Sequence, residues 1–291
     1  MKVGITANPN KPAAVDLARR AVERLGTTTE LVLGEELRSV APERPHRPLG
    51  DLNPDVLVAI GGDGTFLYAM HRCDAPLLPI NAGTVGVLAE IDGRHPSEFD
   101  DALERLLAGR YHLEDRMKLA AQLAARRLPD AVNEFVLHAG EVGRMGLFEL
   151  AFDGQVVGRI QADGIIVATP TGSTGYSLSA LGPIVDPGLD AVVLTTIAPF
   201  RVEARAVVVD PLRTVRLRLV DFGRGAVVIA DGQESEPLAS NATVTIYRSP
   251  RRATFVRFSS RYFDRLRGKR ILPWTESLSE GGPPADLPPS P

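Results

Sequence analysis

The amino-acid sequence predicts an α/β N-terminal domain, built on a three-layer parallel sheet, followed by a β-rich antiparallel C-terminal domain. Three compact apolar segments, 2–8, 55–60 and 76–80, alternate with helical patterns, as in α/β proteins. From about residue 113 onward, short segments alternate apolar and polar residues, and no long helical pattern occurs. This change in pattern predicts that the C-terminal sheet has one buried face and one face in water.

Two amphipathic helices are predicted in the N-terminal domain. The first begins near Pro12 and stops before Gly26, because proline suits a first turn and glycine an end. The second covers 97–109, with Ser97 as its N-cap and Gly109 as its stop. The apolar face of the first helix consists of Val15, Ala18, Val22 and Leu25. The proline-rich segment 42–54 is predicted to be a surface loop.

The C-terminal domain is predicted from a hairpin and several alternating strands. Asp153-Gly154 lies between two apolar segments and is typical of a two-residue hairpin turn. Further strands are expected at 215–220, 244–247 and 253–258. The predicted division is 1–112 for the α/β domain, 113–258 for the β-rich domain, 259–275 for a segment that returns to the first domain, and 276–291 for a disordered tail.

The composition is that of a globular intracellular protein. Hydrophobic residues make up 44% and charged residues 24% of the 291 residues, which argues against wholesale disorder. The net charge of −3 gives no reason to expect nucleic-acid binding. Cys73 is the single cysteine, and no apolar run approaches the ~20 residues of a membrane span. We therefore expect a cytoplasmic protein that binds neither nucleic acid nor membranes.

The segment Gly61-Gly62-Asp63-Gly64-Thr65 follows a predicted parallel strand. Open α/β sheets bind ligands at this edge, and glycines let the backbone approach phosphate. A helix that starts near Thr65 would add free N–H groups for an anion. Asp63 would repel phosphate unless it accepts a proton or holds a metal. We interpret Gly61, Gly62 and Thr65 as a phosphate loop; the alternative is a tight turn in which Asp63 caps the helix.

A second polar segment, 81–86, also follows a short apolar strand. It contains Asn81 and two glycines, Gly83 and Gly86, which suit a backbone wall of the same cleft. An ordinary turn would explain it equally well.

Asn133 and Glu134 stand together inside an apolar strand pattern. Such polar neighbours are costly to bury without hydrogen-bond partners. A ribose would satisfy both side chains, and so would partners within the protein at a strand end.

The segment 162–187 places an apolar strand before a loop rich in hydroxyls and glycines. Small donors at this density suit phosphate and ribose oxygens, and Tyr176 can stack on a base. Other chemistries lack their motifs: the chain has no G-x-x-x-x-G-K-[ST], no G-x-S-x-G and no paired histidine spacing for a metal.

Taken in this order, the four segments resemble the NAD kinase family over roughly residues 1–272. The resemblance implies that Asp63 is the catalytic proton acceptor, that Gly64 lies beside it on the ligand, and that Asn133 and Glu134 bind NAD. The further NAD contacts that it implies are Arg144, Gln161, Asp163, Gln233 and the loop Thr174, Gly175, Tyr176, Ser177, Leu178 and Ser179. Phe200 departs from the family, which often has histidine there.

The resemblance implies transfer of the γ-phosphoryl group of ATP to the 2′-hydroxyl of the adenosine ribose of NAD, giving NADP. We expect a divalent cation, Mg²⁺, as cofactor, metal ligands that the sequence does not identify, and a homo-oligomer. A lipid or sugar kinase with the same loop would leave the hydroxyl-rich segment unexplained. A nucleotide sensor without activity would leave Asp63 unexplained.

Overall fold

The computed structural model describes residues 1–83, 86–141, 143–201, 204–220, 225–259, 262–269 and 271–272. The chain divides into two compact units, 1–258 and 259–291. In the second unit, part of the segment 259–275 forms the helix α5 (Tyr262–Gly268). The predicted tail, 276–291, lies outside the described residues. None of the helices within the described ranges is long and apolar enough to cross a membrane.

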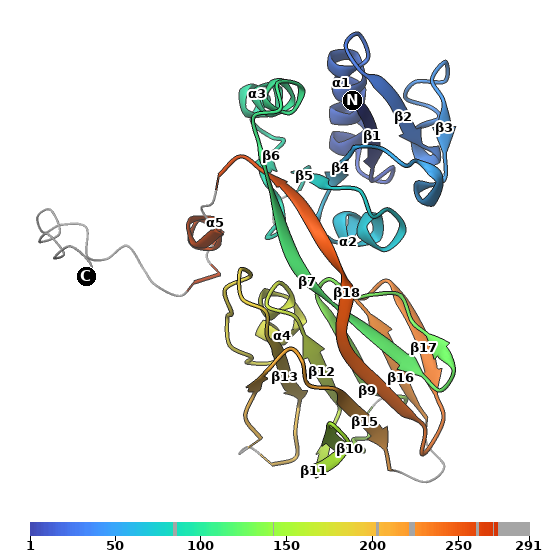
Figure 1. Cartoon of the computed structure of the whole chain (residues 1–291), viewed down its shortest axis with the longest axis vertical. Helices are drawn as coiled ribbons and strands as arrows, with labels where there is room; N and C mark the ends of the chain where they lie inside the picture. The colour runs from blue at the N-terminus through green and yellow to red at the C-terminus, as the bar shows by residue number, and fades with distance from the viewer. Residues whose placement is uncertain are drawn as a thin grey trace, which may run out of the picture. The chain divides into compact units, whose positions relative to one another are not determined.

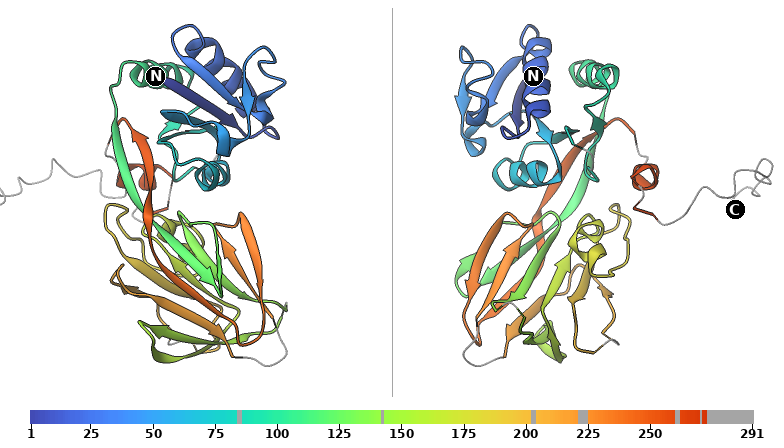
Figure 2. Two further views of the ribbon diagram at one scale, coloured as in Figure 1. Left: turned by 45° about the vertical axis from the view of Figure 1, so that its right-hand side comes forward. Right: turned by 180° about the vertical axis from the view of Figure 1, so that it is seen from behind.

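The N-terminal part of the first unit is a parallel sheet between helices, which confirms the predicted α/β fold. Strand order is β5-β4-β1-β2-β3, and all of these neighbours run parallel. Helices α1 (Pro12–Leu25) and α3 (Pro96–Leu107) pack on one face, and α2 (Asp63–Arg72) packs on the other (Figure 2). The strands are β1 (Lys2–Ala7), β2 (Glu30–Gly34), β3 (His46–Arg47), β4 (Val56–Gly61), β5 (Leu77–Asn81) and β6 (Ile91–Asp92).

The predicted N-cap of α3 is wrong. The helix begins at Pro96, after His95. Proline is favoured at this position because its fixed φ suits a first turn, and because an N–H in the first turn has no partner within the helix. Gly109 does follow the end of the helix, at φ +65. The loop at 42–54 contains β3 and a short 3₁₀ turn, Leu49–Asp51; two further 3₁₀ turns are Glu35–Leu37 and Gly172–Thr174.

The C-terminal part is β-rich and antiparallel, as the alternating patterns predict, and the structure shows that it consists of two packed sheets. Among the described residues, one is a six-stranded antiparallel sheet in the order β14-β13-β12-β9-β16-β17. The large core between it and the second sheet includes Phe135, Phe148 and Leu217. The predicted turn at Asp153-Gly154 joins β10 to β11 with φ values of 50 and 86. The six strands are β9 (Glu134–Ala139), β12 (Gly164–Ala168), β13 (Val192–Ile197), β14 (Val207–Val209), β16 (Ala226–Ala230) and β17 (Glu234–Leu238).

Two long strands connect the two parts. β7 (His112–Leu123) and β18 (Thr243–Arg257) run side by side from the α/β part into the β-rich part (Figure 1). The two strands predicted at 244–247 and 253–258 are one strand, β18, with a register shift between Arg248 and Arg252. Its far end pairs with β5 through Phe255 and Leu77, so the parallel and antiparallel strands form one sheet. The remaining elements are β8 (Arg126–Arg127), β10 (Gly146–Phe152), β11 (Gln155–Ala162), β15 (Val215–Leu219) and α4 (Tyr176–Ser179).

Candidate functional site

The glycine segment at 61–65 is the turn from β4 into α2. Gly61 ends the strand, Gly62 is the N-cap, and Asp63 is the first helical residue. A Cβ on Gly61 would lie 2.7 Å from the Cβ of Thr65, so only glycine lets Thr65 fold back over the turn. The turn therefore exposes the N-terminus of α2 at the carboxyl edge of the sheet, where anions are stabilised.

Asp63 is held in one orientation by the backbone of a second loop. Its Oδ2 accepts the Val87 N–H at 2.9 Å, and its Oδ1 accepts the Leu88 N–H at 3.1 Å. These bonds join α2 to the segment after β5 instead of capping α2, which was the alternative interpretation. Each carboxylate oxygen retains a second lone pair, so Asp63 still has capacity to accept a proton.

A cleft of about 520 Å³ opens beside this turn. It is lined by Gly62, Gly64 and Thr65 from the turn, by Lys11 at the start of α1, and by Glu36 in the 3₁₀ turn after β2. A Cβ on Gly62 or Gly83 would lie only 3.5 or 3.2 Å from Nζ of Lys11, so the ammonium lies close to both glycine segments. Sequence reasoning missed Lys11; the available signal was a cation just after the first strand, at the same sheet edge.

Asn81 organises the second glycine segment. Its side-chain amide donates to the Gly83 carbonyl at 2.8 Å and accepts the Gly83 N–H at 3.1 Å. The side chain is buried, and a Cβ on Gly86 would lie 2.9 Å from its Cγ. The turn thus brings Gly83 to Lys11. Residues 84 and 85 of this predicted wall lie outside the described residues.

Asn133 and Glu134 present buried oxygens without partners. Within the described chain, no hydrogen bond reaches Oδ1 of Asn133 or Oε2 of Glu134. Burial, and then the nearby charge of Asp231, raise the pKa of Glu134 to about 8, against the backbone N–H of Tyr176, which lowers it. Because an unpaired buried polar atom costs roughly 1–3 kcal/mol, these atoms indicate a place where a ligand forms hydrogen bonds.

Replacing Glu134 with glutamine should remove a pH-dependent loss of stability. With a pKa of about 8, the folded chain keeps a proton that the unfolded chain releases near its usual value of 4.5. The free energy of unfolding should therefore fall by up to a few kcal/mol as pH rises through this window, and E134Q should lack that fall. Urea unfolding at several pH values measures both proteins, and parallel pH profiles would contradict the prediction.

Asp231 connects the two halves of the site, a role that the sequence did not predict. Its carboxylate accepts the N–H groups of Val132, Asn133 and Glu134 at 2.7, 2.8 and 2.9 Å. It also lies 2.8 Å from Nε2 of His71, on α2, and both side chains are almost fully buried. Next to it, a Cβ on Gly64 would lie 3.9 Å from Nε2 of Gln233. The helix that carries Asp63 and the strand that carries Glu134 are therefore fixed to the same turn.

The loop at 169–179 packs directly on Asn133 and Glu134. A Cβ on Gly175 would lie 3.1 Å from Oε2 of Glu134 and 3.4 Å from Nδ2 of Asn133. Tyr176 is 42% exposed, so its ring is accessible for stacking. Several hydroxyls have partners inside the protein: Thr169 bonds to Val132, Ser173 to Pro170, Thr174 to Thr171 and Ser177 to Thr195. Leu178 is half-buried and Ser179 exposed.

Arg144 and Gln161 line cavities other than the cleft of Lys11. Arg144 lies 3.6 Å from Glu141 in a turn. Gln161 lines a cleft of about 750 Å³ together with Phe200, which is 68% exposed. Asp163 joins β11 to β12, where its backbone bonds to Ala139 and Ile197. The role of these three residues in binding NAD stays a prediction.

Two family models match the chain. The ATP-NAD kinase N-terminal domain matches residues 3–111, and the ATP-NAD kinase C-terminal domain matches residues 132–258. The first match contains the turn with Asp63, and the second contains the Asn133–Glu134 pair and the turn of Asp231.

Curated relatives and solved structures agree with these models. The chain is 38% identical to an NAD kinase of Thermococcus kodakarensis, with 89% of this chain and 95% of the relative covered. It is 37% identical to an NAD kinase of Methanothermobacter thermautotrophicus, with 96% and 99% covered. An NAD kinase from Archaeoglobus fulgidus in complex with ATP superposes with a TM-score of 0.76 at 30% identity, over 92% of this chain and 98% of that one. Yeast NADH kinase complexed with NADH has the same fold, with a TM-score of 0.83 at 22% identity and 98% and 90% covered. The chain belongs to the NAD kinase family.

Proposed function

We propose that the two halves of this site divide the reaction of the family between them. ATP occupies the cleft beside Lys11, and the adenosine ribose of NAD faces Asp63 from the side of Asn133 and Glu134. The observation that carries the proposal is the pair of unpartnered buried oxygens on Asn133 and Glu134, beside a turn that also fixes the helix of Asp63. A ribose hydroxyl both donates and accepts hydrogen bonds, so it can pair with the amide oxygen of Asn133 and with the carboxyl of Glu134.

The donor side is suited to polyphosphate. Backbone N–H groups at the start of α2 and the ammonium of Lys11 offer positive charge on two sides of the same cleft. Glu36 also lines the cleft and accepts a hydrogen bond from Thr6 at 2.5 Å. Because the Glu36 carboxylate would repel the phosphates, they bind near the Lys11 ammonium instead.

The reaction is a direct in-line transfer. The 2′-hydroxyl oxygen of the adenosine ribose attacks the γ-phosphorus of ATP, the bond to the bridging β–γ oxygen breaks, and ADP leaves. The hydroxyl proton passes to Asp63 late in the step, once the bond to phosphorus has lowered the basicity of the oxygen. The two N–H donors from Val87 and Leu88 hold the carboxylate in place before substrate arrives, so little reorganisation is needed.

A divalent cation fits this site as part of the nucleotide. Among the residues that the structure describes, no group of three or more His, Cys, Asp and Glu side chains could form a metal cage. Mg²⁺ commonly binds through substrate phosphates with only one or two carboxylates. Asp63 is the carboxylate of the glycine turn and would help to hold the cation, which would neutralise phosphate charge there.

Replacing Lys11 with methionine should raise the KM for MgATP by roughly 10- to 100-fold, because a hydrogen bond to a charged group contributes about 1.5–3 kcal/mol. The KM for NAD should change by less than about twofold, since Lys11 lies on the donor side. Steady-state titration of each substrate measures both constants. Lys2→Met is the matched control, because that ammonium bonds to the Leu52 carbonyl outside the cleft. An equal rise in both KM values would contradict the division of the site.

A further inference from the structure

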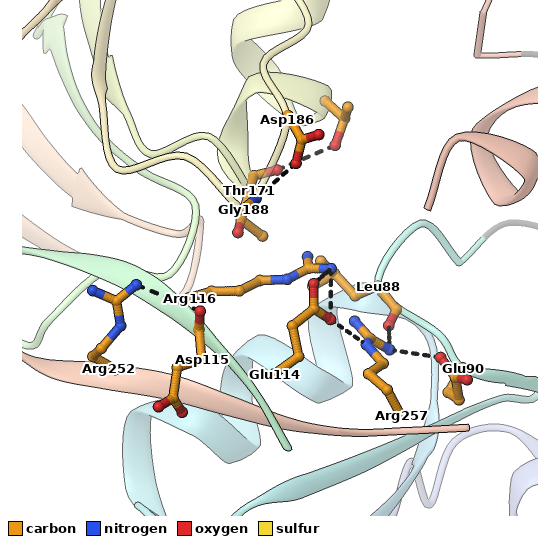
Figure 3. A network of polar contacts seen from close by, with 11 residues as sticks. Leu88, Glu90, Glu114, Asp115, Arg116, Thr171, Asp186, Gly188, Arg252 and Arg257 are labelled. Atoms are coloured by element: carbon orange, nitrogen blue, oxygen red, sulfur yellow. Dashed lines mark hydrogen bonds and ion pairs between the residues drawn. The ribbon is translucent and has the colours of Figure 1, made fainter. Parts of the chain in front are cut away.

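A buried cluster of charges lies behind the loop that holds Asp63. Arg257, at the end of β18, is 1% exposed, and so is Arg116 on β7. Figure 3 shows both guanidinium groups directed at Glu114, with Leu88 and Glu90 beside Arg257. Burying a guanidinium group costs free energy unless opposite charges and hydrogen bonds compensate. Each of these two arginines therefore depends on the partners that surround it.

Arg257 has three partners in different directions. Its Nε donates to Glu114 at 2.6 Å, and its Nη1 donates to the Leu88 carbonyl at 3.0 Å and to Glu90 at 3.2 Å. The guanidinium also lies over the Phe255 ring, 4.5 Å from its centroid. A planar fork with donors at fixed angles can make these contacts together, whereas a lysine ammonium on its flexible stem cannot.

Leu88 links this cluster to Asp63. Its carbonyl binds Arg257, and its N–H binds Oδ1 of Asp63 at 3.1 Å. The preceding N–H, from Val87, binds Oδ2. Just beyond the end of β18, the Phe258 N–H donates to Glu90 at 2.9 Å. The end of β18 therefore fixes the loop at positions 88 and 90, and the loop in turn fixes both oxygens of Asp63.

We propose that Arg257 is a positioning residue for phosphoryl transfer: through Leu88 it sets the direction in which the Asp63 carboxylate faces the reacting hydroxyl. The inference rests on the proposed role of Asp63 as proton acceptor. Arg257 touches neither substrate, so its loss should lower kcat and leave substrate binding unchanged. Misplacing a catalytic group by about 1 Å can cost roughly 100-fold in rate.

The test compares Arg257→Lys with Arg116→Lys. Both arginines are 1% exposed, bind Glu114 and lie over Phe255, so both substitutions disturb the same buried cluster. R257K should lower kcat by roughly 10- to 100-fold, with the KM values for NAD and ATP changed by less than about threefold. R116K should lower kcat by less than about threefold. Thermal unfolding and NAD calorimetry report whether each variant is folded.

A double-variant cycle separates positioning from general loosening of the fold. In the Asp63→Asn background, no carboxylate remains to be oriented, so R257K should change the residual rate by less than about twofold. If R257K does not fold, Glu90→Gln, which weakens one of the partners of Arg257, should lower kcat by roughly threefold at unchanged KM.

The outcomes are distinguishable. Full activity of a folded R257K, or an equal loss for R257K and R116K, would overturn the inference while leaving the role of Asp63 intact. A rise in KM without a change in kcat, or the same loss in the Asp63→Asn background as in the wild type, would also overturn it. High activity of Asp63→Asn by itself would instead remove the proposed proton acceptor.

Discussion

Asp63→Asn should lower kcat by roughly a thousandfold or more, within the range expected for loss of a positioned general base. The amide is nearly isosteric with the carboxylate, but it cannot accept the hydroxyl proton. It also turns an N–H₂ group toward one of the two backbone donors, Val87 or Leu88, that the carboxylate satisfies. NAD affinity should change by less than about tenfold, or ~1.4 kcal/mol, because the other contacts of the dinucleotide remain.

Single-turnover assays measure the rate, and calorimetry measures NAD binding. Asp16→Asn is the control, since that carboxylate pairs with Arg19 on the exposed face of α1 and should leave kcat unchanged. Retention of a tenth or more of the wild-type kcat by Asp63→Asn would show that Asp63 is not the essential proton acceptor.

Replacing both Asn133 and Glu134 with alanine should weaken NAD binding by roughly 10- to 100-fold, corresponding to about 1–3 kcal/mol of lost hydrogen bonds. ATP binding should change by less than about threefold, because neither residue lines the cleft of Lys11. In the folded chain, one oxygen of Asn133 and one oxygen of Glu134 have no hydrogen-bond partner. Removing these side chains should therefore weaken NAD binding more than it lowers the free energy of unfolding.

Calorimetric titration with each nucleotide tests this, together with urea unfolding of the free variant. The matched control is Asn10→Ala with Glu23→Ala, which changes two exposed side chains of the same types on the α/β part. Equal weakening of NAD and ATP, or a large loss of stability with unchanged NAD affinity, would mean that the pair is structural.

The sequence predicted those parts of the fold that depend on local chemistry. The hairpin at Asp153-Gly154 follows from residues that tolerate positive φ, and the turn at 61–65 follows from glycines after an apolar strand. The helix cap at Ser97 was wrong because a neighbouring proline competed for the start of the same helix. The hydroxyls at 169–177 were interpreted as ligand donors, whereas those of Thr169 and Ser173 are buried and bond to the protein itself.

The parts of the site that the sequence did not predict depend on contacts between distant residues. Asp231 acts on the backbone at 132–134, and Arg257 acts on Leu88 from the end of another strand. Arg257 stands in no local pattern that distinguishes it from a surface charge, and the resemblance singled out Gln233, two residues after Asp231, as the contact in its segment. Lys11 was missed for the same reason: its place in the site follows from the parallel sheet, which brings its loop beside Gly62 and Gly83.

The pairing of β18 with β5 has a consequence for the synthesis of the chain. Leu77 leaves the ribosome long before its neighbour Phe255, which also completes the core on the α2 face together with Ala253. Until β18 emerges, a nascent chain with the whole α/β sequence still exposes an incompletely paired strand and part of its apolar core, features that favour association with other chains. The first part of the protein to be made is thus among the last to be finished, and its protection during translation depends on residues near the other end.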